Sequence, residues 1–538
     1  MNILVAEPVS PAGVALLQAQ PGWNVIVSNP KEYAAHLAGA DALLVRSAVK
    51  VNADVLAKAP NLKVIGRAGV GVDNVDLKAA TAAGVLVMNT PGGNAISVAE
   101  HTIALMLAMA RSIPQASAST KSGKWEKKKF LGNELRGKTL GVVGLGSIGR
   151  EVVRRARPFE MRIVGSDPYI NPRTAQDLGV ELVDLQTLYA ESDYITLHVA
   201  LTTETHQMIA DAALSRMKNG VRIVNCARGE LIDGAALARA IESGKAAGAA
   251  LDVFQTEPPA AGEPLLGFDS VIATPHIGGS TEEAQEIVGV RIAEQLLEYL
   301  KSGVAINAVN IPAMTPEQYR AVGPYLTLAE RLGRFVSFIA DGNPSAIRVI
   351  YTGSIAEQNT ALLRNAALAG VLSRPLGTRV NAVNSMQIAA DRKLTVSERH
   401  EARSGFGDTV RVEIETDKGK TSAEAAVVLG KPRLVQVDEI PCEAPLDGNL
   451  TYCKNVDVPG VIGFIGTVFG RSGLNIANFS LGRQEHAIPG QPLEAMSVIE
   501  TDQPVTEKVL AELMGNPGMK LARAVELAPR PSALQAGN

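Results

Sequence analysis

The sequence predicts an α/β protein with two doubly wound parallel-sheet lobes, followed by two smaller α+β units. Through roughly the first 300 residues, short apolar strands alternate with helical segments, the pattern of βαβ units in a parallel sheet. One of these strands runs into a glycine-rich turn, GLGSIG, at residues 144–149. After residue 316 the strands follow one another through turns, which is typical of antiparallel sheets.

The first lobe is expected to hold five strands. They are Ile3–Ala6, Val25–Ser28, Ala42–Arg46, Val64–Arg67 and Val85–Asn89. Ligand-binding loops of such sheets lie beyond the carboxyl ends of the strands. Arg46 and Arg67 stand at two such ends; either could be a surface residue, but together they favour an anionic ligand. The glycines of GVGVD (69–73) would let backbone N–H groups approach a small ligand.

The strand–turn–helix–strand segment that ends at Asp167 has the parts of a dinucleotide site. The strand Leu140–Val143 leads into the turn, where Gly144 permits the tight bend. Gly146 admits the pyrophosphate, and Gly149 lets the helix pack closely. The helix N-terminus offers free N–H groups to phosphates. Asp167 can accept hydrogen bonds from both ribose hydroxyls and would repel a 2′-phosphate, so the segment predicts an NAD-binding, Rossmann-like lobe.

Three charged or titratable residues follow the last strands of this lobe. The later strands are expected at Tyr194–Val199, Arg222–Asn225, Ala249–Val253 and Val271–Thr274, which makes six in all. Arg228, Glu257 and His276 lie on the loops after the last three and should emerge on the cofactor side of the sheet. Their types fit hydride exchange at a 2-hydroxy acid. The histidine moves the hydroxyl proton, the carboxylate orients the imidazole, and the guanidinium grips the substrate.

Other interpretations stay open for single residues. Arg228 beside a glycine and Glu257 before two prolines could each be ordinary loop residues. His198 could contact the cofactor or simply pack in the strand end. His101 is interpreted as a packed residue of a long apolar helix that should run from Ala95 to about Arg111.

The last 80 residues or so run strand, helix, strand, strand, helix, strand, the order of a ferredoxin-like unit. Asp457 and Asn475 are expected near one another at its first strand–helix corner. The preceding unit carries no recognisable chemistry, and its strands are expected at Arg348–Thr352, Lys393–Ser397, Thr409–Glu415 and Ala425–Leu429.

Composition excludes several classes of function. A net charge of −3 gives no general field for holding nucleic acid. Three cysteines form neither a metal-ligand pattern nor an even disulfide set, so no metal is expected. The most apolar stretch, Ile103–Ala110, is too short to span a membrane, and the N-terminus lacks a basic secretory region. These features predict a cytoplasmic protein without a membrane partner.

The motifs GLGSIG, NCARGELID, ALDVFQTEP and TPHIGGST together resemble the D-isomer-specific 2-hydroxyacid dehydrogenases. RSAVKV and GRAGVGVDNVDL are most similar to the D-3-phosphoglycerate dehydrogenases, in their long form with intervening and ACT domains. The resemblance implies NAD-dependent oxidation of 3-phosphoglycerate to 3-phosphohydroxypyruvate, the first step of serine biosynthesis. It also implies a homotetramer and a serine effector bound at the ACT domain.

The resemblance extends to individual residues. It implies that Arg228, Glu257 and His276 are catalytic. Beside the three glycines of the turn, it implies NAD contacts at Ser147, Ile148, Asp167, Val199, Cys226, Ala227, Arg228, Asp252, His276 and Gly278. It implies substrate contacts at Arg46, Ser47, Arg67, Gly69, Val70 and Asn94, and effector contacts at Asp457 and Asn475. Ala200 departs from the family, which usually has proline there, and leaves the contacts of His198 and Val199 open.

The expected domains follow from the same pattern. A flavodoxin-like substrate-binding domain (1–94 and 284–315) is interrupted by the Rossmann-like NAD domain (95–283). An intervening domain (316–449), similar to allosteric substrate-binding domains, and an ACT regulatory domain (450–528) complete the chain. Two other functions are considered: a related glyoxylate, hydroxypyruvate or D-lactate reductase, and an NAD-sensing transcriptional co-repressor.

Overall fold

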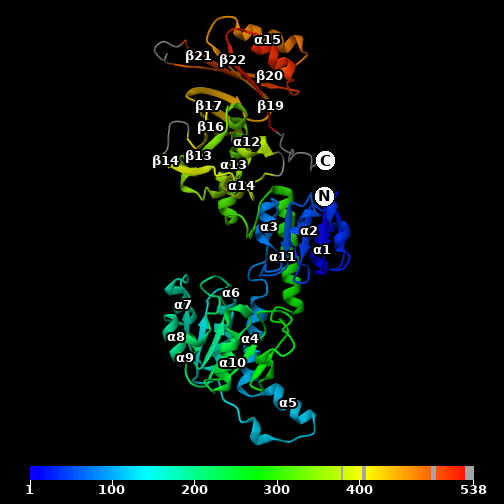
Figure 1. Ribbon diagram of the computed structural model, residues 1–538, viewed down its shortest axis with the longest axis vertical. Coiled ribbons are helices and arrows are strands. Elements are labelled where there is room, and N and C mark those ends of the chain that lie inside the picture. The colour runs from blue at the N-terminus through cyan, green and yellow to red at the C-terminus, as the bar shows by residue number, and fades with distance from the viewer. Residues whose placement is uncertain (377–379, 403–406, 486–491, 528–538) are drawn as a thin grey trace.

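The computed structural model describes residues 1–376, 380–402, 407–485 and 492–527, which form four sheets. The sheets follow one another along the long axis of the molecule, with the seven-stranded sheet at one end and the four-stranded sheet at the other (Figure 1). The predicted α/β class with two parallel-sheet lobes is confirmed. The domain boundaries remain a prediction, and the last of them, residue 528, lies outside the described residues.

The first sheet is entirely parallel, with the flavodoxin-like order β2-β1-β3-β4-β5. Its strands are β1 (Asn2–Val5), β2 (Asn24–Val27), β3 (Ala42–Val45), β4 (Val64–Arg67) and β5 (Leu86–Met88). The helices of this lobe are α1 (Pro11–Gln18), α2 (Ala53–Ala57), α3 (Leu77–Ala82) and α11 (Glu282–Ser302).

Helix α11 returns the chain to this first lobe, as predicted. It packs against α1 and β4, and its buried side chains Ile292 and Leu296 lie directly over Gly66. A Cβ at Gly66 would lie 2.8 Å from Cγ1 of Ile292, so only glycine allows this approach. The NAD lobe is therefore an insertion between β5 and α11.

The second sheet is also parallel throughout, in the order β12-β11-β10-β9-β6-β7-β8. Its strands are β6 (Thr139–Val143), β7 (Arg162–Ser166), β8 (Glu181–Leu182), β9 (Tyr194–Leu197), β10 (Val221–Asn225), β11 (Ala246–Leu251) and β12 (Val271–Ala273). The helices are α4 (Ala95–Ala110), α5 (Ile113–Lys121), α6 (Ser147–Ala156), α7 (Pro172–Leu178), α8 (Leu185–Glu191), α9 (Asp211–Arg216) and α10 (Gly234–Glu242). The sheet has one strand more than the six predicted, because β8 is only two residues long and gives no alternating pattern.

The third sheet is mixed, in the order β14-β13-β15-β16-β17-β18. Its strands are β13 (Pro344–Thr352), β14 (Thr395–Glu401), β15 (Thr409–Thr416), β16 (Gly419–Val428), β17 (Lys431–Val437) and β18 (Ile440–Pro445). Its helices are α12 (Pro316–Ile339), α13 (Ala361–Leu376) and α14 (Ser385–Asp391). The expected antiparallel arrangement is wrong for β13 and β14, which pair in parallel. The two helices between them form the crossover that a parallel pair requires.

The fourth sheet has the predicted βαββαβ order, and its strands lie as β20-β21-β19-β22 with antiparallel pairing throughout. Its elements are β19 (Gly448–Val456), α15 (Val461–Arg471), β20 (Ile476–Arg483), β21 (Glu494–Thr501), α16 (Glu507–Met514) and β22 (Met519–Leu527). The face without helices packs on α12 of the third unit, where the rings of Phe335 and Tyr452 meet edge to face at 6.0 Å. The third and fourth units thus share one apolar core.

Among the described residues, no single helix is long and apolar enough to cross a membrane. Helices α4 and α5 reach the required length only when counted together across a bend of 62°. Much of α4 is buried in the NAD lobe.

Candidate active site between the two parallel-sheet lobes

The glycine turn has the local geometry that a dinucleotide needs. Gly144 has a φ of +91°, and a Cβ on it would lie 2.5 Å from the carbonyl oxygen of His198. A Cβ at Gly146 would meet nothing within 4 Å, so the turn is open where a pyrophosphate would approach. At Gly149 a Cβ would lie 2.0 Å from the Gly144 carbonyl oxygen, which keeps α6 tight against the turn. The N-terminus of α6, at Ser147 and Ile148, faces this opening with its free N–H groups.

Asp167 reaches the same turn from the end of β7. Its Oδ2 accepts a hydrogen bond from the Leu145 N–H at 2.8 Å. Its Oδ1 accepts from the N–H groups of Tyr169 and Ile170, which fixes the carboxylate. An aspartate held at this point is where an adenosine ribose would present its two hydroxyls. The residues present therefore fit NAD.

The wall beside the turn is uncharged. Burial lowers the pKa of His198 to about 3, so its ring is neutral, and its Nε2 lies 2.9 Å from Thr196 Oγ1. Its Nδ1 is buried without a hydrogen-bond partner among the described residues, so packing and a cofactor contact both stay open for His198. Val199 lies against Gly144, and burial raises the pKa of the Cys226 thiol to about 12. Cys226 and the neighbouring Ala227 begin the loop after β10.

His276 and Glu257, which are 19 residues apart in the chain, are hydrogen-bonded to one another. His276 Nδ1 lies 2.7 Å from Glu257 Oε2, and the two side chains are 53% and 37% exposed. The other oxygen, Oε1, accepts from the Phe254 N–H at 3.1 Å, so the carboxylate is held from its own loop. With Nδ1 directed at the carboxylate, Nε2 of His276 is left as the free ring nitrogen.

Asp252 organises the loop that carries His276. It is 1% exposed, and its oxygens accept from the Thr274 hydroxyl (2.5 Å), the Ile277 N–H (2.9 Å) and the Gly278 N–H (2.8 Å). Burial by itself raises the pKa of Asp252, but hydrogen bonds from His101, Thr274 and the two backbone groups outweigh it, so the pKa lies below its ordinary value. The carboxylate is therefore charged and faces the loop; its contact with NAD remains a prediction.

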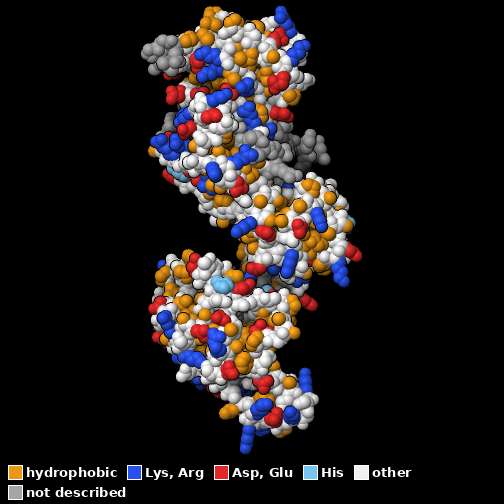
Figure 2. Space-filling view, in the orientation of Figure 1, with side chains coloured by type: hydrophobic (Ala, Val, Ile, Leu, Met, Phe, Trp, Pro, Cys, Tyr) orange, Lys and Arg blue, Asp and Glu red, His pale blue; other side chains and the backbone are white. Residues whose placement is uncertain are grey.

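Arg228 reaches from the NAD lobe to the first lobe. Its Nη2 lies 2.9 Å from Asp73 Oδ2, in the loop that follows β4 of the first lobe. Figure 2 shows a hollow in the surface where the two lobes meet. Gly71 makes room for Arg228, because a Cβ there would lie 2.0 Å from the same Nη2 nitrogen. The loop of Arg228 packs on the loop of Glu257, since a Cβ at Gly229 would lie 2.0 Å from the Phe254 carbonyl carbon. The three predicted catalytic residues thus lie on adjoining loops at one edge of the sheet.

Arg67 and Arg46 add positive charge on the other side of the hollow. The Arg67 guanidinium wraps over Gly69, and its Nε has no hydrogen-bond partner within the described residues. Burial and the charge of Arg228 lower the pKa of Arg67, which stays protonated all the same. Arg46 donates from Nη1 to the Pro8 carbonyl at 3.2 Å.

The other predicted substrate residues surround these arginines. Gly69 and Val70 are tied to the segment between β5 and α4, because the Thr90 N–H donates to the Gly69 carbonyl (2.9 Å) and the Asn89 amide to the Val70 carbonyl (2.5 Å). Ser47 follows Arg46 in the loop after β3. The amide oxygen of Asn94 is buried without a hydrogen-bond partner in the described residues, and its contact with the substrate remains a prediction.

Asp457 and Asn475 do not meet, so the prediction that places them together is wrong. Asp457 pairs with Arg483 at 2.6 Å, at the end of β20, whereas Asn475 donates to Asp502 at 2.8 Å, before β20 begins. The eight residues of β20 separate the two positions. The mistake has a simple cause: β19 and β20 run in the same direction, so the loop leaving β19 and the loop entering β20 lie at opposite ends of the sheet.

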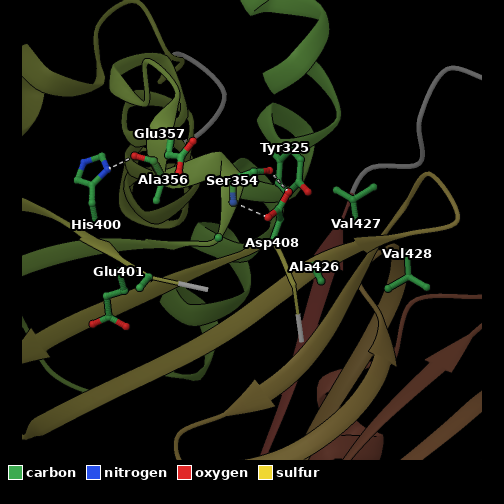
Figure 3. A pocket seen from close by; sticks show the side chains of 12 residues that line it. Tyr325, Ser354, Ala356, Glu357, His400, Glu401, Asp408, Ala426, Val427 and Val428 are labelled. Atoms are coloured by element: carbon green, nitrogen blue, oxygen red, sulfur yellow. Dashed lines mark hydrogen bonds between the residues drawn. The ribbon is translucent and has the colours of Figure 1, made fainter. Parts of the chain in front are cut away.

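A pocket of about 770 Å³ opens in the third unit, away from these loops, and Figure 3 shows its lining. Several of its polar groups already have partners in the chain. His400 Nδ1 lies 2.7 Å from the Ala356 carbonyl oxygen, and Asp408 accepts from the backbone and hydroxyl of Ser354. No group of three or more potential metal ligands occurs in the described parts of the chain.

Sequence reasoning missed three residues that shape the site. Glu7 is buried and accepts from the N–H groups of Arg46, Ala48 and Val49, so it fixes the Arg46–Ser47 loop. It lies two residues after the end of β1, and the rule for carboxyl ends of strands would have found it. The sequence placed Asp73 only in the glycine-rich GVGVD loop, and it gave His101 only the role of a packed helix residue. Neither residue was predicted to contact the site.

Two family models match the chain. The model for the D-isomer specific 2-hydroxyacid dehydrogenase NAD binding domain covers residues 103–278, and the D-3-phosphoglycerate dehydrogenase intervening domain covers 321–438. A curated D-3-phosphoglycerate dehydrogenase from Methanocaldococcus jannaschii is 43% identical over 98% of this chain and 100% of its own length. The chain belongs to the D-3-phosphoglycerate dehydrogenase family. It is accordingly an NAD-dependent oxidoreductase.

Further relatives of this family member extend the agreement. The D-3-phosphoglycerate dehydrogenase of Bacillus subtilis is 37% identical over 98% of the chain and 99% of its own length. A crystal structure of D-lactate dehydrogenase from Aquifex aeolicus, complexed with NAD and lactic acid, matches with a TM-score of 0.51 and 30% identity. That match covers 58% of the chain and all of the other protein. Such structures support NAD as the cofactor of this dehydrogenase.

Replacing Asp167 with serine is expected to lower kcat/KM with NAD by about 10- to 100-fold, because hydrogen bonds to a charged group are lost. Activity with NADP should rise relative to NAD, because the repulsion of a 2′-phosphate is removed. Initial rates with the two nucleotides measure both effects. The matched control is Asp177→Ser, on the exposed side of α7. An unchanged NAD to NADP ratio would argue against the ribose contact.

Proposed function

We propose that this chain oxidises 3-phospho-D-glycerate to 3-phosphohydroxypyruvate with NAD, the first step of serine biosynthesis. Relatives that match this chain over nearly their whole length are named D-3-phosphoglycerate dehydrogenase. The observation that carries the proposal is the meeting of His276–Glu257 with Arg228 on adjoining loops, opposite Arg46 and Arg67. The substrate has a carboxylate and a phosphate, and three guanidinium groups facing one hollow supply the charge that both need.

His276 serves as the acid–base residue in this proposal. Its free Nε2 accepts the proton of the C2 hydroxyl as hydride leaves C2, and returns that proton in the reverse direction. Glu257, at 2.7 Å from Nδ1, fixes the tautomer and stabilises the imidazolium that forms. When bound at the glycine turn, NAD supplies the hydride acceptor.

Arg228 grips the substrate carboxylate and polarises the C2 oxygen. The carboxylate of Asp73 occupies the same guanidinium at 2.9 Å, which supports Arg228 as a carboxylate binder at this point of the hollow. Arg46 and Arg67 then remain for the phosphate. In this proposal the substrate carboxylate takes the place of the Asp73 carboxylate on Arg228.

Initial rates with 3-phosphoglycerate and NAD, compared with unphosphorylated 2-hydroxy acids, test the proposal. Preference for the phosphorylated acid supports it. Faster turnover of glyoxylate or hydroxypyruvate with NADH would favour a related reductase, and binding of NAD without any turnover would favour a co-repressor-like binding protein.

We also propose that the chain forms a homotetramer. An arm formed by α5 and η2 (Lys127–Phe130) extends from the NAD lobe (Figure 1). Its Trp125 and Leu131 are 80% and 92% exposed, and such apolar side chains are typical of a covered interface. Light scattering of the intact protein and of a Trp125→Ser, Leu131→Ser double variant should give a smaller assembly for the variant; equal masses would contradict this role.

The last proposal concerns serine as an effector of the ferredoxin-like unit, for which we propose the role of an ACT domain. Because Asp457 and Asn475 lie at opposite ends of β20, one copy of the unit cannot offer both to a single amino acid. A serine molecule that contacts both residues would have to lie between two copies of the unit. Rates measured with and without serine test for inhibition, and an unchanged rate would contradict the effector role.

The cytoplasmic location stays a prediction, which fractionation of expressing cells would check.

A further inference from the structure

His101 lies on α4. The sequence predicted it to be a packed helix residue, yet its ring contacts the loop that carries His276. His101 Nε2 is 3.1 Å from Thr274 Oγ1 and 3.3 Å from Asp252 Oδ1. The ring is 18% exposed on its side chain, so these contacts are shielded from water. His101 and Thr274 are 173 residues apart in the chain, and only the packing of α4 on the late strands of the sheet brings them together.

The hydrogen-bond network decides which form the His101 ring takes. The Asp252 carboxylate is charged and can only accept, and the Thr274 hydroxyl donates its proton to Asp252 Oδ1. The Nε2 of His101 can therefore contribute to this pair only as a donor. Two donor side chains from different elements hold one carboxylate oxygen, and the second oxygen receives the Gly278 N–H.

Asp252 in turn holds both sides of His276. It binds the side chain of Thr274 before the histidine and the N–H groups of Ile277 and Gly278 after it. Between these anchors His276 has a φ of +55°, a conformation that costs energy for a residue other than glycine and persists only where its surroundings impose it. Loss of an anchor should let this backbone relax and move the imidazole away from Glu257.

We propose that His101 is a positioning residue for the reaction: it fixes the Asp252 carboxylate and thereby holds His276 against Glu257. The inference rests on the proposed function in one respect, that His276 moves the proton. A misplacement of about 1 Å of such a group can cost up to about 10²-fold in rate. His101 itself touches neither reacting atoms nor Glu257.

The chain offers a sharp test, because the bond is made by Nε2. The amide nitrogen of glutamine and Nε2 of histidine are the same number of bonds away from Cβ. His101→Gln therefore keeps a hydrogen-bond donor at nearly the same place. His101→Leu fills similar space without a donor. His206→Leu, at an exposed site in the same lobe, is the matched control. For each variant we would measure kcat, the NADH dissociation constant by fluorescence, and the rate at which diethyl pyrocarbonate modifies His276, read by peptide mass spectrometry.

We expect His101→Leu to lower kcat by about 10- to 100-fold. NADH binding should fall much less than kcat, because the glycine turn and Asp167, where the pyrophosphate and ribose are expected to bind, are untouched. The rate at which diethyl pyrocarbonate modifies His276 should differ from that in the unchanged protein, because the imidazole no longer lies against Glu257. His101→Gln should restore most of kcat and of the original modification rate, and His206→Leu should change neither.

Three results would overturn the inference. They are full activity of His101→Leu, equal losses in the leucine and glutamine variants, and a loss of kcat matched by an equal loss of NADH-binding sites, which would indicate unfolding. If the unchanged protein fails to turn over the hydroxy acid, the proposed function fails instead. The modification rate of His276 still decides the positioning role in that case.

Discussion

Replacing His276 with glutamine is expected to lower kcat by about 10²- to 10⁴-fold, the usual worth of positioned proton transfer. Glutamine has about the same reach but cannot take the hydroxyl proton. NADH binding should persist, because the glycine turn and Asp167 are untouched. Stopped-flow measurement of hydride transfer, with a deuterated C2 position, reports the chemical step directly.

The control for this experiment is His206→Gln, which changes the same side chain at an exposed site in the NAD lobe. It should retain the full rate. A His276→Gln protein with more than a tenth of the original kcat would remove the histidine from the proton path, whatever its contact with Glu257.

Replacing Arg228 with lysine is expected to lower kcat/KM for the hydroxy acid by about 10²- to 10³-fold. Lysine keeps the charge but loses the planar fork that can bind a carboxylate with two parallel hydrogen bonds. Arg228 Nη2 lies 2.9 Å from Asp73 Oδ2, and a Cβ at Gly71 would lie 2.0 Å from that nitrogen, so the guanidinium is closely held at this point. Steady-state rates over a range of substrate concentration measure the loss.

Arg239→Lys is the matched control, because Arg239 makes an exposed pair with Asp211 at 2.6 Å in the same lobe. This pair is solvated and should contribute little to either stability or rate. Equal effects of the two substitutions would mean that Arg228 acts only through its charge.

Most of the fold could be predicted because its signals are local. The apolar runs of both parallel sheets give strands close to those observed, and the glycine turn shows the positive φ at Gly144 and the open space at Gly146 that its pattern implied. The parallel pairing of β13 and β14 was missed because the helices between them were not recognised from their apolar pattern. Without that crossover, two successive strands suggest an antiparallel pair.

The candidate site was partly predictable for a geometric reason. In a parallel sheet every strand ends at the same edge, so Arg228, Glu257 and His276 had to emerge together once their strands were located. The same reasoning failed for Asp457 and Asn475, which belong to loops at opposite ends of their sheet. It also gave no means of finding the role of His101, which lies on a helix and meets Thr274 and Asp252 only because that helix packs on the sheet.

The sequence by itself determined the elements, their order and the edge of the sheet that carries the chemistry, because periodicity, turn residues and strand direction are properties of neighbouring residues. Only the tertiary structure decided which side chains meet: Arg228 with Asp73 across two lobes, and His101 with Thr274 across 173 residues. Such contacts depend on how helices and sheets pack. Packing is set by the shapes of whole surfaces, which no local pattern in the chain specifies.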